Sequence, residues 1–179
     1  MTTILLTGMP GSGKEEFLNV AREEGYDVIR MGDVVREHAE KKGISFEDQS
    51  LGSFADEERV EHHEGIWADR TLCNITEQRT VIDGIRSTEE VSIFKSELGD
   101  LKIVAIHASP DTRFERLKER GREDAPHTWS EFNDRDKREL NWLKAGIEKQ
   151  TRNSTISTAK RKDRLTINSL RNTSLNQDT

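Results

Sequence analysis

A glycine-rich turn between an apolar segment and a helical one constrains this chain more than any other feature of its sequence. Residues 8–14 (Gly-Met-Pro-Gly-Ser-Gly-Lys) follow the apolar run 4–6 and precede a segment, 15–21, with a helical pattern. Strand, glycine-rich turn, lysine and helix in this order are typical of a loop that binds phosphate. Glycines let consecutive backbone N–H groups converge on phosphate oxygens, and the helix directs its positive end at the same anion. The sequence therefore predicts a site for a nucleoside triphosphate, ATP, formed by Gly8, Met9, Pro10, Gly11, Ser12, Gly13, Lys14 and Glu15.

Glu15 departs from the usual form of such a loop. A Ser or Thr hydroxyl normally follows the lysine and coordinates Mg²⁺, whereas this chain has a carboxylate there. A carboxylate binds Mg²⁺ directly or through water, so Glu15 is a candidate metal ligand that also brings negative charge close to the phosphates. Three interpretations stay open: phosphoryl transfer, nucleotide binding without catalysis, and a turn that merely links a strand to a helix.

Length and composition limit the class of protein. A chain of 179 residues suffices for one domain with a proper core. The single Cys73 excludes an internal disulfide and gives no zinc pattern. No segment approaches the roughly 20 apolar residues that span a bilayer, and the N-terminus lacks the pattern of a secretory signal. We therefore expect a soluble cytoplasmic protein with no membrane partner.

The charge is distributed unevenly along the chain. The formal net charge is −6, but residues 1–140 carry −11 and residues 141–179 carry +5. An acidic body argues against nucleic acid as a partner, because nucleic-acid binding needs a broad basic face. The basic, polar tail at 146–179 is expected to be weakly ordered. An edge strand at 164–168 stays open, as does recruitment of nucleic acid or an acidic partner by the tail.

Strand and helix patterns alternate along residues 1–145. Short apolar strands are expected at 2–7, 27–31, 80–83 and 101–107, with helices between them, and one or two charged helices at 46–78. This alternation predicts an α/β fold with a parallel sheet covered on both faces. Ligands bind at the carboxyl ends of the strands in such folds, so the residues that end the strands become candidates: Gly8, Gly32, Asp83 and His107.

Two acidic–basic motifs follow strand ends. Asp33 and Arg36 lie three residues apart and can share a helix face; Arg36 could clamp an acceptor phosphate, or it could pair with Glu40 while Asp33 caps the helix. Asp83 and Arg86 flank a glycine at the end of a buried strand. Asp83 could hold the Mg²⁺ shell, and the alternative is an ordinary Asp-Gly turn.

A third motif is rich in arginine. Residues 113–122 and 135–138 contain Arg113, Arg116, Arg120, Arg122, Arg135 and Arg138. Arginines on a closing segment stabilise the charge that develops during phosphoryl transfer, while each taken singly fits an ordinary solvated helix pair. The polar segment 121–128 between the two helices could be a short lid or a helix connection of ordinary length.

The order of these motifs resembles the nucleoside monophosphate kinase superfamily. Adenylate kinases carry a comparable Gly-Asp-x-x-Arg and Asp-Gly-x-Pro-Arg pair, and the chain is more similar to the archaeal adenylate-kinase-related or dephospho-coenzyme A kinase-like P-loop group. The phrases GMPGSGKEEF, VIRMGDVVRE, VIDGIRS, VAIHASP and RFERLKERGR carry this resemblance, which covers about residues 1–142. It implies a five-stranded parallel sheet, a helical acceptor-binding insert at about 33–78 and a small lid at about 121–128.

The resemblance also implies roles for individual residues. It implies that Gly11–Glu15 bind the phosphates of ATP and Mg²⁺, and that Arg36 and Arg86 bind the acceptor phosphate. It also implies that Arg116 and Arg120 lie near ATP, and that Arg135 and Arg138 close on the transferred group. The expected activity is transfer of the γ-phosphoryl group to a small phosphorylated or hydroxyl acceptor, by a monomer or homodimer. Asp33 is the best-placed base for a hydroxyl acceptor. The other interpretation is an ATP-binding regulator or slow NTPase. Ile85-Arg86 lacks the proline of adenylate kinases, and the sequence after Trp142 does not follow the family pattern.

Overall fold

The computed structural model describes residues 2–44, 48–99, 101–121, 125–144 and 155–157, with the side chains of 48–50, 138, 141–144 and 155–157 outside that description. Its elements, in chain order, are β1 (Thr2–Thr7), α1 (Lys14–Glu23), β2 (Asp27–Arg30), α2 (Met31–Lys41), α3 (Asp48–Glu61), α4 (Ile66–Leu72), β3 (Arg79–Asp83), α5 (Thr88–Leu98), β4 (Leu101–His107), α6 (Pro110–Arg120), α7 (Trp129–Lys144) and β5 (Thr155–Ser157). The predicted alternation of strands and helices is confirmed.

The five strands form one parallel sheet in the order β2-β3-β1-β4-β5. Because all strands run the same way, their carboxyl ends lie along one edge. This confirms the predicted α/β P-loop fold with a parallel sheet flanked by helices. The described fifth strand is β5, which pairs with β4, and the strand considered at 164–168 lies outside the described residues, as does the rest of the tail apart from β5.

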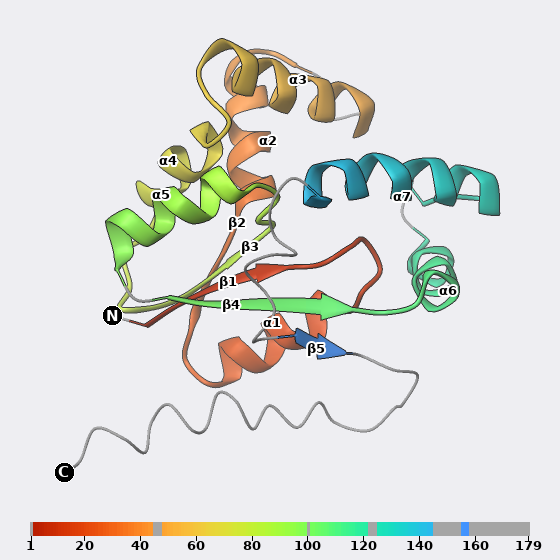
Figure 1. Ribbon diagram of the computed structural model, residues 1–179, viewed down its shortest axis with the longest axis horizontal. Helices are drawn as coiled ribbons and strands as arrows, with labels where there is room; N and C mark the ends of the chain where they lie inside the picture. The colour runs from red at the N-terminus through yellow and green to blue at the C-terminus, as the bar shows by residue number, and fades with distance from the viewer. Residues whose placement is uncertain (1, 45–47, 100, 122–124, 145–154, 158–179) are drawn as a thin grey trace.

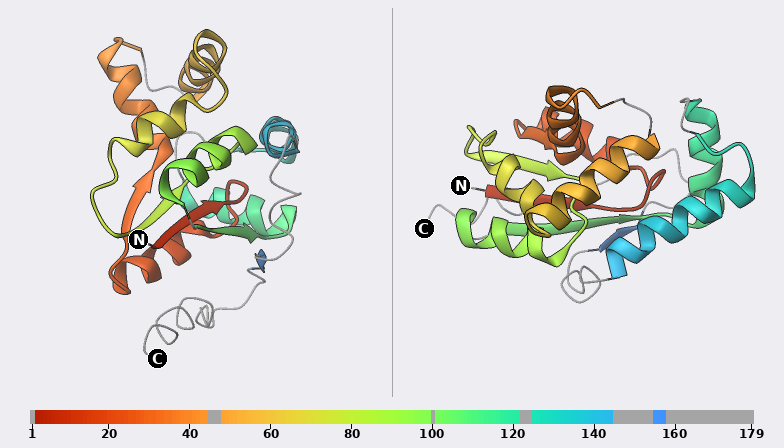
Figure 2. Two further views of the ribbon diagram at one scale, coloured as in Figure 1. Left: turned by 60° about the vertical axis from the view of Figure 1, so that its left-hand side comes forward. Right: turned by 90° about the horizontal axis from the view of Figure 1, so that it is seen from above.

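Alternate residues of the strands pack into two cores. Leu5 and Ile82 point to one face, where α2, α3, α4 and α5 cover the sheet. Ile4, Leu6 and Val81 point to the other, where they pack with residues of α1. Successive side chains of a strand face opposite ways, so a sheet covered on both faces needs the continuous apolar runs seen in the sequence. Figures 1 and 2 show this layered arrangement.

Most helix ends follow the sequence signals. The Ser87–Glu90 capping box opens α5, Pro110 lies in the first turn of α6, and Gly121 caps that helix in a left-handed conformation. The strand predicted at 27–31 is one residue too long: β2 ends at Arg30, and α2 begins at Met31. The earlier start places Met31 in the apolar core, and Gly32 therefore lies in the helix rather than at a strand end.

The insert predicted at 33–78 contains three helices. Most of α2 lies within it, together with α3 and α4, and α3 lies farthest from the sheet in Figure 1. Trp67 of α4 is fully buried and donates from Nε1 to the backbone oxygen of Ala55 on α3, at 3.1 Å. This bond joins α4 to α3, and the apolar core that both share with Leu5 and Ile82 packs the segment against the sheet.

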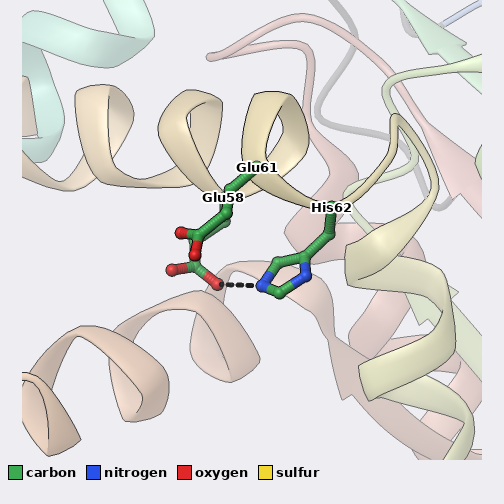
Figure 3. A group of neighbouring side chains, drawn as sticks. All are labelled: Glu58, Glu61 and His62. Carbon is green, nitrogen blue, oxygen red and sulfur yellow. Dashed lines mark ion pairs between the residues drawn. The ribbon is translucent and has the colours of Figure 1, made fainter.

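The insert also contains the one grouping of potential metal ligands found in the described part of the chain: Glu58, Glu61 and His62 (Figure 3). The ligand atoms of these residues lie within 4.8 Å of one another. Glu58, however, is buried and accepts hydrogen bonds from Lys42 and, at 2.5 Å, from Arg70. Since two cations already neutralise its carboxylate, we interpret this grouping as an ion-pair centre that joins α2, α3 and α4.

Glu58→Ala is expected to lower the free energy of unfolding by about 3 kcal/mol, because it leaves two cations without their shared carboxylate. The hydrogen bond from Lys42 is the largest of several influences that keep the pKa of Glu58 below its ordinary value of 4.5. A lowered carboxyl pKa stabilises the fold above the unfolded value, and this contribution disappears as the pH falls through the folded value. Urea unfolding at pH 7 and pH 4 measures both effects.

The exposed neighbour Glu61 provides the matched control for this variant. Glu61→Ala should change the free energy of unfolding by no more than about 0.5 kcal/mol, as is usual for surface positions. Equal losses in the two variants would contradict the assignment of Glu58 as the centre of the cluster.

Candidate functional site

The phosphate loop (residues 8–14) lies beyond the carboxyl end of β1, and α6 and α7 lie at the same end of the sheet (Figures 1 and 2). Gly11 has φ +77°, and a Cβ there would lie 2.7 Å from the backbone oxygen of Arg113 on α6. A side chain at Gly11 would therefore push the loop away from α6. The close approach and the positive φ explain the need for glycine at this position.

The first helix leaves its N–H groups facing this loop. Gly13 is the N-cap of α1, has a left-handed conformation, and provides no side-chain cap. The first N–H groups of a helix have no partner within the helix, and together with the helix dipole they favour an anion. The predicted strand–loop–helix arrangement is thus present.

Lys14 turns back over the loop from the first position of α1. Its Nζ donates to the backbone oxygen of Gly8 at 2.6 Å. Burial is the main cause that lowers the pKa of Lys14 below its ordinary value of 10.5; the charge of Asp83 opposes the shift. The ammonium group therefore sits in a site where an additional negative group, such as a phosphate, would be strongly favoured.

Asp83 ends β3 beside the loop. Its Oδ1 is buried and has no hydrogen-bond partner among the described residues. Burial raises the pKa of this carboxyl above 3.8, and the nearby charges of Lys14 and Arg30 oppose the shift. A buried oxygen without a partner is costly and suits a metal ion or its water shell. The residues at this edge therefore fit Mg²⁺, with Asp83 as the strongest candidate.

Glu15, the other predicted metal ligand, is engaged in ion pairs. Both of its carboxylate oxygens accept from Nη2 of Arg30, at 2.6 and 2.7 Å, and Nη1 of Arg22 lies 3.5 Å from Oε1. Oxygen ligands for a hard cation are therefore present at this position, but they are shared with a guanidinium group at the end of β2.

The candidate acceptor residues form two further pairs. Asp33 and Arg36 bind one another at 2.6 Å on an exposed face of α2, so the alternative pairing of Arg36 with Glu40 is not the one the structure has. Arg86 lies 3.4 Å from Glu139 of α7. The backbone N–H of Arg86 donates to Glu90 at 2.7 Å, which fixes the turn that carries the arginine.

The arginines of α6 and α7 separate into different environments. Arg116 donates to the backbone oxygens of Gly11 and Ser12 at 3.3 and 3.0 Å, and the charge of Arg120 is close enough to act on the pKa of Lys14. Arg135 is half-buried, and the side chain of Arg138 lies outside the described residues. Two of the four predicted arginines are thus described next to the phosphate loop.

Arg113 has a structural role. It is buried, donates from Nε to the backbone oxygen of Ala108 at 3.1 Å, and binds both carboxylate oxygens of Asp136. This pair and an aromatic cluster of Phe114, Trp129 and Phe132 attach α7 to α6. Residues 122–124 of the predicted lid lie outside the described residues.

Two residues near the site were not anticipated from the sequence. Arg30 binds Glu15, and Glu139 contacts Arg86 and acts electrostatically on Lys14. The sequence contained a signal for Arg30, because this residue lies near the carboxyl end of a predicted strand, where ligands bind in parallel sheets. Glu139 had none, because its proximity depends on how α7 crosses the sheet edge.

In the described part of the chain, the helices are too short or too polar to traverse a lipid bilayer.

Comparison with known proteins shows which proteins this chain resembles. Two archaeal relatives are both 46% identical over 140 residues: a UPF0200 protein of Hyperthermus butylicus, covering 76% of this chain and 75% of the relative, and UPF0200 protein Ta0179 of Thermoplasma acidophilum, covering 78% and 77%. The solved structure of TT1252 from Thermus thermophilus is 18% identical, covers 88% of each chain and has a TM-score of 0.53, so it shares the fold.

A family model described as an AAA domain matches residues 7–133, from the end of β1 into α7. The match includes the phosphate loop, Asp83 and the arginines of α6. The chain therefore belongs to this AAA-domain family of P-loop NTPases and to the UPF0200 proteins.

Proposed function

We propose that this protein is an ATP-dependent phosphotransferase of the nucleotide kinase or dephospho-coenzyme A kinase type. It would transfer the γ-phosphoryl group of ATP to a small acceptor that carries a phosphate or a hydroxyl group. The observation that carries the proposal is the half-buried Lys14, which is bent over the glycine loop and lies within electrostatic reach of Asp83, whose buried Oδ1 has no partner among the described residues. A loop with only a connecting role needs neither of these charged groups.

Each part of the site has a role in this reaction. Lys14 and the loop N–H groups would bind the β and γ phosphates, and Glu15 and Asp83 would hold Mg²⁺, which neutralises the phosphate charge when bound. Arg116 and Arg120 would lie along the nucleotide, Arg36 and Arg86 would bind the acceptor, and Arg135 and Arg138 would close on the transferred group. Positioning and charge neutralisation provide most of the catalysis in such reactions.

The chemical step depends on the acceptor. An acceptor oxygen forms a bond to the γ-phosphorus while the bond to the β–γ bridging oxygen breaks, and ADP leaves. A phosphate acceptor already carries negative charge and needs no strong base. A hydroxyl acceptor must lose its proton, which Asp33 would take. Asp33 is exposed and paired only with Arg36 in the described structure, and such surface pairs are weak enough to open.

Asp33→Asn separates these two cases. With a hydroxyl acceptor we expect kcat to fall about 100-fold or more, because general-base catalysis is lost. With a nucleoside monophosphate kcat should stay close to that of the parent. Coupled-enzyme assays over a panel of both acceptor classes measure the difference. Glu37→Gln, which removes another exposed acid of α2 paired with Lys41, is the control and should leave both activities intact. Equal losses with both acceptor classes would remove Asp33 as the base.

An ATP-binding regulator or slow NTPase is the second candidate. The ion pair between Glu15 and Arg30 favours it, because the carboxylate in the metal position is already engaged. Tight ATP binding with no product from any acceptor in the same panel would select this function over phosphotransfer.

A further inference from the structure

Arg30 occupies a position that neither the phosphate loop nor the acceptor side accounts for. It is the last residue of β2, and the sheet register pairs it directly with Asp83 at the end of β3. Its Nη2 lies 2.6 and 2.7 Å from the two oxygens of Glu15 in the first turn of α1. The guanidinium of Arg30 thus lies close to both carboxylates, Glu15 and Asp83, that are candidates to bind a divalent ion.

The position of Arg30 affects how this edge of the sheet would receive a triphosphate, because the neighbouring side chains are charged. A triphosphate entering the loop without metal would meet the negative charges of Glu15 and Asp83, which repel it. Arg30 neutralises Glu15 directly, and its charge also opposes the rise in the pKa of Asp83. A divalent ion arriving with the nucleotide would neutralise the same carboxylates, and it would have to compete with Arg30 for Glu15.

We propose that Arg30 is a built-in counter-cation that shares Glu15 with the divalent ion bound to the nucleotide. This inference rests on the ATP site proposed above and deepens it. Arg30 would act as a positioning residue: it makes Glu15 tolerable in a phosphate loop that usually has a hydroxyl there, and it determines how strongly nucleotide binding depends on metal.

Arg22 is the natural comparison within the chain. It also pairs with Glu15, but at 3.5 Å and from the last turn of α1. It hydrogen-bonds Asn19 at 3.0 Å and is not a register partner of Asp83. Removing Arg22 deletes the same formal charge near Glu15 without vacating the place beside Asp83, so Arg22→Met is the matched control for Arg30→Met.

The test measures binding of a fluorescent ATP analogue to the full chain, with excess EDTA and with excess Mg²⁺. The ratio of interest is the Kd with EDTA divided by the Kd with Mg²⁺. Arg30→Met should raise this ratio by about tenfold, the equivalent of one charge-assisted hydrogen bond, because the affinity without metal falls. Arg22→Met should leave the ratio close to that of the parent, and Arg30→Lys, which keeps the charge, should lie nearer the parent than Arg30→Met does. In a Glu15→Gln background, Arg30→Met should raise the ratio less than it does in the parent, because only the charge of Asp83 is left for Arg30 to offset.

A second readout follows the metal itself. Electron paramagnetic resonance of Mn²⁺ should show tighter Mn²⁺ binding to the ATP complex of Arg30→Met, since Glu15 is released from its ion pair. Binding should be weaker in Glu15→Gln. The second measurement tests the shared carboxylate even if Arg30→Met does not fold. An unchanged Kd ratio in Arg30→Met, or a change equal to that in Arg22→Met, would overturn the role of Arg30 while leaving the ATP site in place. Failure of the parent to bind the analogue under both conditions would instead remove the proposed function, and this inference with it.

Discussion

A Lys14→Met variant is expected to bind ATP about 100-fold more weakly than the parent, the upper range for a hydrogen bond to a charged group. Any phosphoryl transfer should fall by about 1,000-fold, because the preorganised charge at the β and γ phosphates is lost. The methionine keeps the apolar stem that fills the loop, so the loss concerns charge rather than packing. Isothermal titration with an ATP analogue measures the affinity, and a coupled assay measures the turnover.

The same variant has a second signature that a general folding defect cannot imitate. Burial lowers the pKa of Lys14, so its protonated form costs the folded state free energy without nucleotide. For a lysine with a lowered pKa this cost is fully present below the folded pKa and disappears as the pH rises past the unfolded value. Lys14→Met should therefore have a Tm at pH 7 equal to or above that of the parent, and any gain should shrink toward alkaline pH.

Lys41→Met is a suitable control for the loss of a lysine, because Lys41 is exposed and pairs with Glu37, its neighbour on α2. Its ATP affinity should match that of the parent. If Lys14→Met retained the triphosphate as tightly as Lys41→Met, the phosphate loop would not be the nucleotide site.

Gly11→Ala is expected to weaken ATP binding by about tenfold or more, the scale of losing one hydrogen bond to a charged phosphate. A Cβ at Gly11 would lie 2.7 Å from the backbone oxygen of Arg113 and 3.1 Å from Cγ of Leu117. Backbone cannot rotate away as a flexible side chain can, so the loop or α6 must move, and Arg116, which contacts the loop, moves with it. Titration with an ATP analogue measures the loss.

Gly43→Ala separates this steric effect from backbone strain. Gly43 has φ +71°, close to that of Gly11, but a Cβ there meets no atom within 4 Å. Both variants carry the left-handed strain of about 1–2 kcal/mol, so both should lose some thermal stability, whereas only Gly11→Ala should lose ATP affinity. Equal ATP affinity in the two variants would contradict the tight contact between the phosphate loop and α6.

Local patterns predicted much of this fold because the physics that determines them is local. Apolar runs of four to seven residues located the strands that the structure has, and the Ser87–Glu90 capping box lies where α5 begins. The strand predicted at 27–31 was one residue too long, because the packing of Met31 into a core formed by distant segments outweighed the local apolar pattern. The phosphate loop was predictable for the same reason as the elements: its glycines, lysine and following helix are consecutive.

The sequence by itself determined the order of strands and helices, the parallel sheet and the place of the phosphate loop, because hydrophobic period and turn chemistry act over a few residues. Only the tertiary structure decided which charges meet at the edge of that sheet. Glu15 binds Arg30, Arg86 lies beside Glu139, and Asp83 retains a buried oxygen without a partner in the described part of the chain. Those pairings depend on strand register and on how α7 crosses the sheet, and both arise from contacts between residues far apart in the chain.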